Sequence, residues 1–149
     1  MVRAVQILPD NNILDGAHNE AGIVKLQDSL NTMFGSQKYC IIFGFFLDKD
    51  YKNSLKLLAN LADEFYLVPV TNSMNREYVN PQKLKEDLLQ LGFNKDKLKT
   101  FNSVSNALDC NSKKRKIIIG SLFLQQYVLR SYYSDEEIIN LNKTRFMTT

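Results

Sequence analysis

Short apolar runs of strand length alternate along this chain with longer segments that carry apolar residues at helical spacing. The clearest runs are Tyr39–Phe43, Phe65–Val68 and Ile117–Ile119, and each is apolar throughout. Continuous apolar runs of this length indicate strands that are buried on both faces. Their alternation with helices predicts a largely parallel sheet covered by helices on both sides. The predicted fold class is therefore α/β, a Rossmann-like three-layer domain with a mostly parallel sheet.

The remaining elements follow from periodicity and from residues that start or stop helices. The expected order is a strand at 2–8, a short strand at 13–14, a helix at 19–35, a strand at 39–43, a helix with a stripe from Tyr51 to Ala62, a strand at 65–68, a helix at 80–92, an edge strand at 98–101, a short helix at 103–110, a strand at 117–119 and a helix at 122–129. Asn80 as N-cap and Pro81 at the first helical position open the third helix, and Leu84, Leu88 and Leu91 are predicted to form its apolar stripe. Ser134 could cap a last helix, and the polar end 142–149 is predicted to be a tail.

Composition excludes several classes of protein. A chain of 149 residues fits one domain, and a net charge of +3 is too small to indicate nucleic acid or a membrane surface as a partner. The basic run Lys113–Lys116 abuts a buried strand, so a solvated loop explains it better than a phosphate-binding patch.

Cys40 and Cys110 are predicted to be reduced, buried thiols, and one histidine is too few for a zinc site. We expect a cytoplasmic protein without a membrane span.

The segment Leu14–Asn19 carries the chain's one histidine and lies where a short strand gives way to a helix. The carboxyl ends of strands are where open α/β sheets bind ligands. Asp15 can accept hydrogen bonds from a diol such as ribose, and His18 can stack or donate. A purely structural interpretation is also open, in which an Asp-Gly turn is followed by Asn19 as an N-cap.

Three segments, in order, resemble the C-terminal domain of folylpolyglutamate synthase/dihydrofolate synthase, which belongs to the Mur ligase superfamily. They are Leu14–Asn19, Gly44–Asp50 and Ile119–Leu124. In a parallel sheet the loops that begin at Asp15, Gly44, Pro69 and Gly120 should open on one edge, and we expect Asp15 and His18 to face solvent or a cleft there. The resemblance covers about residues 1–131, leaving 132–149 as a C-terminal helix or tail of the same domain. Glu20 stands where the family usually has proline, and an acidic residue suits a first helical turn equally well.

The resemblance implies an ATP-dependent ligase that joins glutamate to a folate carboxyl group. It implies ATP and magnesium as cofactors, with the magnesium ligands outside this chain. No Gly-x-x-x-x-Gly-Lys-Ser/Thr phosphate loop occurs in the 149 residues. In the family that loop belongs to an N-terminal ATPase domain, so we expect that domain as the partner and expect this chain alone to be inactive. Folate and glutamate are the other implied ligands, and the implied oligomeric state is a monomer.

The resemblance also suggests roles for individual residues. Asp15, His18 and Asn19 are candidates for nucleotide binding, and Ser121, Lys49 and Arg76 are candidates for the glutamate side; no catalytic residue is expected in this chain. Ser121 could equally be an N-cap, and Lys49 and Arg76 could be solvated surface residues.

Two alternatives stay open. The chain could be a stand-alone, non-catalytic binding module, or the C-terminal domain of a Mur-type peptidoglycan ligase. The peptidoglycan branch usually has Asp-Tyr-Ala-His-Asn in the first motif, and Gly16 in place of tyrosine favours the folate branch.

Overall fold

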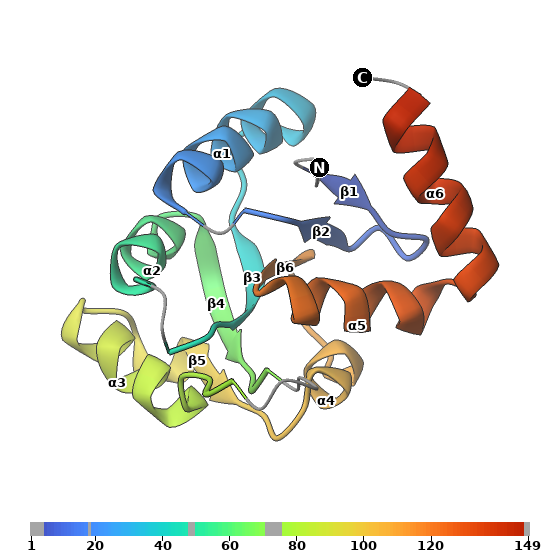
Figure 1. The fold of residues 1–149 in the computed structure, drawn as a ribbon. Helices are drawn as coiled ribbons and strands as arrows, with labels where there is room; N and C mark the ends of the chain where they lie inside the picture. Colours follow the sequence, from blue (N-terminus) through green and yellow to red (C-terminus); the bar gives the residue numbers. More distant parts are fainter. Residues whose placement is uncertain (1–4, 18, 48–49, 71–75, 148–149) are drawn as a thin grey trace.

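The computed structural model describes residues 5–17, 19–47, 50–70 and 76–147, which form one α/β fold (Figure 1). Its elements in chain order are β1 (Gln6–Ile7), β2 (Ile13–Asp15), α1 (Glu20–Phe34), β3 (Tyr39–Gly44), α2 (Lys52–Ala59), β4 (Ala62–Leu67), α3 (Pro81–Gln90), the 3-10 turn η1 (Lys95–Lys97), β5 (Leu98–Thr100), α4 (Val104–Asp109), β6 (Lys116–Gly120), α5 (Leu122–Tyr132) and α6 (Asp135–Met147).

The described strands form one six-stranded sheet in the order β1-β2-β6-β3-β4-β5. Only the edge pair β1–β2 is antiparallel; every other neighbouring pair is parallel. The antiparallel pair follows from the tight turn after Leu8, in which Asn11 adopts a left-handed φ of 69°. The last strand in the chain, β6, lies between β2 and β3, which places the ends of β2, β6 and β3 side by side.

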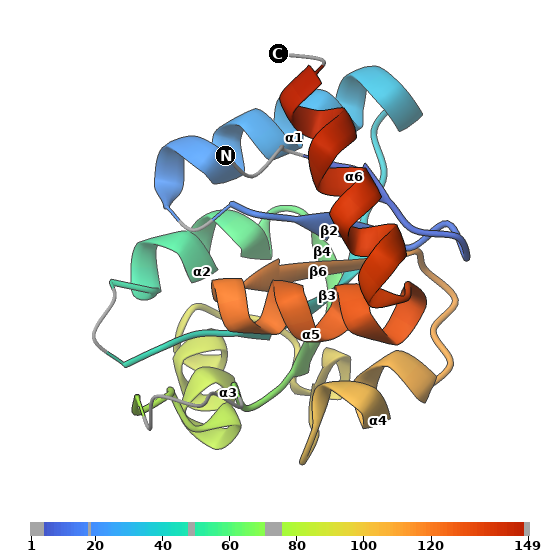
Figure 2. The same cartoon turned by 45° about the vertical axis from the view of Figure 1, so that its right-hand side comes forward.

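Helices cover both faces of the sheet and make a three-layer structure (Figures 1 and 2). Alternate residues of each strand point to opposite faces, so Ile41 and Phe43 pack with α1, α2 and α3, whereas Cys40 and Ile42 pack with α4 and α5. The central strands β3 and β6 are buried along their whole length. The predicted fold class is confirmed, and the apolar runs of the sequence mark the strands that are covered on both sides.

Three differences from the sequence prediction have a clear physical reason in the structure. Ala62 begins β4 instead of ending the preceding helix, because α2 stops at Ala59 and only two residues separate it from the strand. Leu91 is 46% exposed because it is the C-cap of α3 and lies beyond the buried stripe. The segment predicted to be a polar tail is helical as far as Met147, because it continues α6. That helix starts at Asp135 with a charged first turn and with Ser134 as its cap.

The two cysteines also differ from each other. Cys40 is buried, whereas Cys110 is half-buried and lies beside the hydroxyl of Tyr66, with 3.6 Å between sulfur and oxygen. The prediction of a buried thiol is therefore confirmed for Cys40 and wrong for Cys110. Cys110 is the C-cap of the short helix α4 and follows the last apolar position that faces the sheet.

Candidate functional site

The carboxyl ends of three neighbouring strands meet at one edge of the sheet, which we call the rim. Asp15 at the end of β2 pairs with Ile119 of β6, and Gly44 at the end of β3 pairs with Gly120 of β6. The backbone N–H of Ser121 donates to the carbonyl oxygen of Gly44 over 3.2 Å. The prediction that the segments beginning at Asp15, Gly44 and Ser121 share one edge is therefore confirmed. His18 and Lys49, which were predicted to belong to the same site, lie outside the described residues.

Two glycines allow the strands to approach closely at the rim. Gly120 has a φ of 142°, and a Cβ atom at this position would lie 2.0 Å from the carbonyl oxygen of Gly44. A Cβ atom on Gly44 would lie 2.8 Å from the carbonyl oxygen of Val68. Both positions therefore require glycine, and Gly120 requires it for its backbone conformation as well.

Asp15 is buried at the rim, with 1% of its surface exposed. Its Oδ1 accepts a hydrogen bond of 2.7 Å from the backbone N–H of Ala17, which makes a tight turn at the end of β2. Among the described residues, Oδ2 has no hydrogen-bond partner. We predicted from the sequence that Asp15 faces solvent or a cleft, and this prediction is wrong for the structure. The carboxylate folds back onto its own turn and is covered there.

Burial changes the acidity of this carboxylate. Loss of solvent raises the pKa of Asp15 from 3.8 to about 6, and the hydrogen bond from Ala17 offsets part of the rise. A partnerless buried carboxylate oxygen is costly, so the site favours any donor that could reach Oδ2.

Two helices begin at the rim, and each has a polar N-cap. The Asn19 side chain accepts from the N–H of Gly22 over 2.8 Å at the start of α1, which confirms the predicted cap. The Ser121 hydroxyl oxygen accepts from the N–H of Phe123 over 3.1 Å at the start of α5. The N–H groups of a first helical turn and the positive end of the helix dipole make this edge favourable for negative charge.

Arg76 lies at the rim through its contact with an aromatic pair. Its guanidinium carbon is 3.9 Å from the centroid of the Phe46 ring. Phe46 in turn meets Phe123 of α5 edge to face, with 5.6 Å between centroids. The contact follows from pairing of two loop segments, since the N–H of Leu47 donates to the carbonyl oxygen of Glu77 over 2.9 Å. The structure thus brings Arg76 to the same edge as Ser121, although 45 residues separate them in the chain.

Sequence reasoning missed Gln125, a buried amide on α5. Its side chain is 4% exposed, and its Nε2 donates to the carbonyl oxygens of Asp15 over 2.6 Å and of Ile118 over 3.3 Å. The signal in the sequence was a glutamine one turn after Ser121, between the apolar residues Leu124 and Val128 of a helix predicted to pack on the sheet.

A small hollow of about 220 Å³ lies at the carboxyl ends of β4 and β5, on the same edge as the rim. Tyr78, Asn80 and Phe101 contribute to its walls. The segment that begins at Arg76 therefore connects the hollow to the Phe46 ring.

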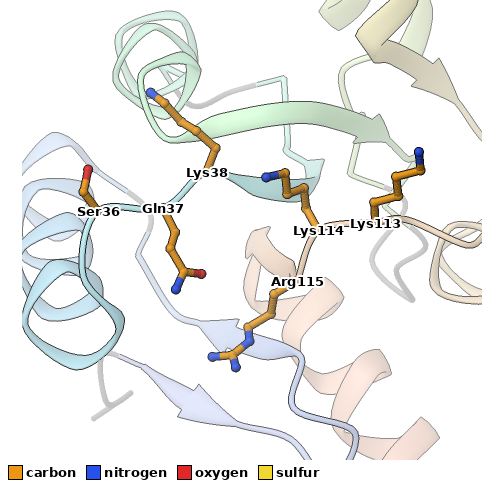
Figure 3. Close-up of a pocket in the computed structure, with 6 residues that line it drawn as sticks. All are labelled: Ser36, Gln37, Lys38, Lys113, Lys114 and Arg115. Carbon is orange, nitrogen blue, oxygen red and sulfur yellow. The ribbon is translucent and has the colours of Figure 1, made fainter.

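A larger hollow of about 490 Å³ lies at the opposite edge of the sheet and is lined by Ser36, Gln37, Lys38, Lys113, Lys114 and Arg115 (Figure 3). Two of its cations, Lys38 and Arg115, lie where helices end. Lys38 donates to the carbonyl oxygen of Asn60 at the C-cap of α2. The guanidinium carbon of Arg115 lies 4.2 Å from the ring centroid of Phe34, the last residue of α1.

The adjoining Lys116 follows the same pattern, since its Nζ donates to the carbonyl oxygen of Leu108 in α4 over 2.5 Å. Cations at the negative ends of helices are stabilising, and this role explains Lys38 and Lys116 without a bound anion. In Figure 3 the ammonium groups of Lys38 and Lys113 point away from each other. The rim therefore remains the better candidate for a functional site.

Within the described ranges no three His, Cys, Asp or Glu side chains lie close enough together to hold a metal ion. In the same part of the chain, no helix is both long enough and apolar enough to cross a membrane.

The profile of the family described as "Mur ligase, glutamate ligase domain" matches residues 5–119. The chain belongs to this family. The match includes the Asp15 turn and Gly44 and ends at Ile119, one residue before the end of β6.

Relatives of this Mur ligase domain include a curated protein and several solved structures. Over 49 residues, 33% of this chain and 11% of the relative, it is 39% identical to the dihydrofolate synthase/folylpolyglutamate synthase of Bacillus subtilis. Its fold is similar to that of folylpolyglutamate synthase from Thermotoga maritima, with a TM-score of 0.70 and 20% identity over 86% of this chain and 29% of that one.

Two solved relatives were determined with bound ligands. One is folylpolyglutamate synthase of Mycobacterium tuberculosis complexed with ADP and AMPPCP, with a TM-score of 0.67 and 18% identity over 83% of this chain and 30% of that one. The other is E. coli FolC in complex with DHPP and ADP, with a TM-score of 0.64 and 20% identity over 93% of this chain and 31% of that one. This Mur ligase domain therefore spans about a third of the length of the solved structures it matches.

Proposed function

We propose that this domain is the C-terminal part of an ATP-dependent folylpolyglutamate synthase/dihydrofolate synthase. It would form one wall of the cleft between itself and an N-terminal ATPase domain. The observation that carries the proposal is the convergence of Asp15, Gly44 and Ser121 at one edge of three neighbouring parallel strands. The named relatives, which are folate enzymes, support this branch of the family over a peptidoglycan ligase.

The reaction would be amide formation in two steps. Transfer of the terminal phosphoryl group of ATP to a folate carboxylate gives an acyl phosphate and ADP. The glutamate amine then attacks the acyl carbon, loses a proton, and expels inorganic phosphate as the amide forms. Water must be excluded from the acyl phosphate, and a cleft that closes between two domains provides this exclusion.

The Asp15 turn would contact the nucleotide. Its Oδ2 is buried, polar and lacks a partner among the described residues, so a ribose hydroxyl could donate to it once the covering atoms move aside. His18 and Asn19, which continue this segment, complete the proposed nucleotide side. The N-terminus of α1, which Asn19 caps, adds a positive field that suits an anionic ligand.

Ser121, Arg76 and Lys49 would serve the glutamate side. Arg76 offers a planar cation for a carboxylate and is oriented by the Phe46 ring. The Ser121 hydroxyl already accepts a hydrogen bond from α5, and its proton remains available for a carboxylate oxygen. Magnesium would be held by residues outside this chain and would neutralise the ATP phosphates.

The proposal is tested by measuring ADP release from two proteins, the purified chain and the ligase that unites it with its ATPase domain. We expect folate- and glutamate-dependent release of ADP from the ligase and none from the 149-residue chain. A folded ligase that hydrolyses ATP without dependence on either substrate would contradict the proposal and favour a non-catalytic binding module.

A further inference from the structure

Gln125 is a polar side chain in an apolar surrounding. It lies on the face of α5 that packs against the sheet, next to the buried Leu124 and near Val128, and is itself 4% exposed. Burial of a primary amide is unfavourable unless its hydrogen-bonding groups are paired. The partners of the Gln125 amide therefore decide whether its burial is tolerated.

Its partners are two main-chain carbonyl oxygens at the rim. Nε2 donates to Asp15 O over 2.6 Å and to Ile118 O over 3.3 Å, so one side chain joins the end of β2 to β6 and α5. The Asp15 turn is therefore fixed at two points. Gln125 holds its main-chain oxygen, and the hydrogen bond from Ala17 N–H to Oδ1 holds its side chain.

We infer that Gln125 is a positioning residue that fixes the Asp15 turn for nucleotide binding; this inference rests on the proposed function. Without the amide, the carbonyl oxygen of Asp15 would be left buried without this donor, and the turn would shift to recover a hydrogen bond. Displacement of the turn by even about 1 Å would move Oδ2 and the N–H groups that follow it away from the ligand. Gln125 would thereby act on the ligand through Asp15, without touching it.

Hydrogen exchange in the chain itself tests the positioning step. Gln125→Met keeps the length of the side chain and removes its donor, and Gln126→Met makes the same change at an adjacent exposed position. The amide of Ala17 reports on the turn, and that of Cys40, which bonds to Arg115 O over 3.0 Å, reports on the sheet. In Gln125→Met we expect exchange at Ala17 to quicken about tenfold relative to Cys40. Gln126→Met should leave the ratio unchanged. An unchanged ratio in Gln125→Met would overturn the inference.

Steady-state kinetics of the ligase test the consequence. Gln125→Met should raise the KM for ATP about tenfold while kcat at saturating ATP changes little. This result is distinct from misfolding, since loss of folded enzyme alone lowers the apparent kcat and leaves KM unchanged. A KM equal to that of Gln126→Met would overturn the inference. Failure of the proposed function has a different signature, in which Asp15→Asn also leaves the KM unchanged while the Ala17 exchange result persists.

Discussion

Gly120 faces the carbonyl oxygen of Gly44 so closely that a Cβ atom at Gly120 would lie 2.0 Å from that oxygen. Together with a φ of 142°, this contact predicts that Gly120→Ala lowers the free energy of unfolding by about 3 kcal/mol or more. Gly92→Ala is the matched control, since Gly92 also has a positive φ and no atom lies near its Cβ position. We expect it to cost about 1–2 kcal/mol. Equal losses in urea unfolding of the two variants would contradict a steric constraint at the rim.

The raised pKa of Asp15 predicts a pH dependence of stability. In the unfolded chain an aspartate titrates near 3.9, and in the folded chain burial raises the pKa of Asp15 to about 6. The folded state therefore binds more protons between these values, and this residue's contribution to stability falls as pH rises from about 4 to 6. The loss is complete about one pH unit above the folded pKa, near pH 7.

Asp15→Asn removes this titration and can keep the hydrogen bond from Ala17. Relative to the unsubstituted chain, its free energy of unfolding should rise by on the order of 2–3 kcal/mol between pH 4 and pH 7. Thermal or urea unfolding of both proteins across this range measures the difference. A difference that does not change with pH would show that the carboxylate is not desolvated.

Ser121 allows its cap and its proposed ligand contact to be separated. Ser121→Ala should lower stability by about 1 kcal/mol, whereas Ser121→Gly should cost only a few tenths, because glycine is tolerated at an N-cap. Both variants lose the hydroxyl, so both should raise the KM for glutamate in the ligase by a similar factor. If the KM is unchanged in both, Ser121 is an N-cap only.

Arg76 should matter more for glutamate than for folding. Its contact with the Phe46 ring predicts that Arg76→Ala lowers stability by about 0.5–1 kcal/mol. Loss of a charge-assisted pair with the glutamate carboxylate should raise the KM for glutamate about tenfold. Arg130→Ala, at an exposed position in the last turn of α5, is the control. The same KM for glutamate in both variants would remove Arg76 from the site.

The sequence predicts the layers of this fold well, because a strand buried on both faces has to be apolar along its whole length. This constraint marks β3, β6 and the second half of β4, from Phe65 onward, and the polar caps Asn19 and Ser121 mark the starts of α1 and α5. Parallel pairing then brings the motifs to one edge. The sequence determines the ends of helices and strands less well. The spacing of Ala62 from Leu58 fits a helical stripe and predicts a helical residue, whereas Ala62 begins β4.

The environment of Asp15 could not be predicted from its neighbours in the chain. An Asp-Gly turn is usually exposed, and the burial of this one depends on α5, whose Gln125 is 110 residues away in the sequence. The place of Arg76 likewise depends on the bridge between Phe46 and Tyr78, two residues from loops that follow different strands. Such long-range contacts leave no periodic signal in the sequence.

The KM for ATP of Asp15→Asn in the ligase tests the central claim most directly. Asparagine keeps an acceptor for the N–H of Ala17, but it removes the carboxylate oxygen that would accept a hydrogen bond from the ribose hydroxyl. Charge-assisted hydrogen bonds of about 1.5–3 kcal/mol predict a rise of roughly ten- to hundredfold. An unchanged KM for ATP, in an Asp15→Asn enzyme that melts as a folded protein, would contradict the proposal that the rim binds the nucleotide.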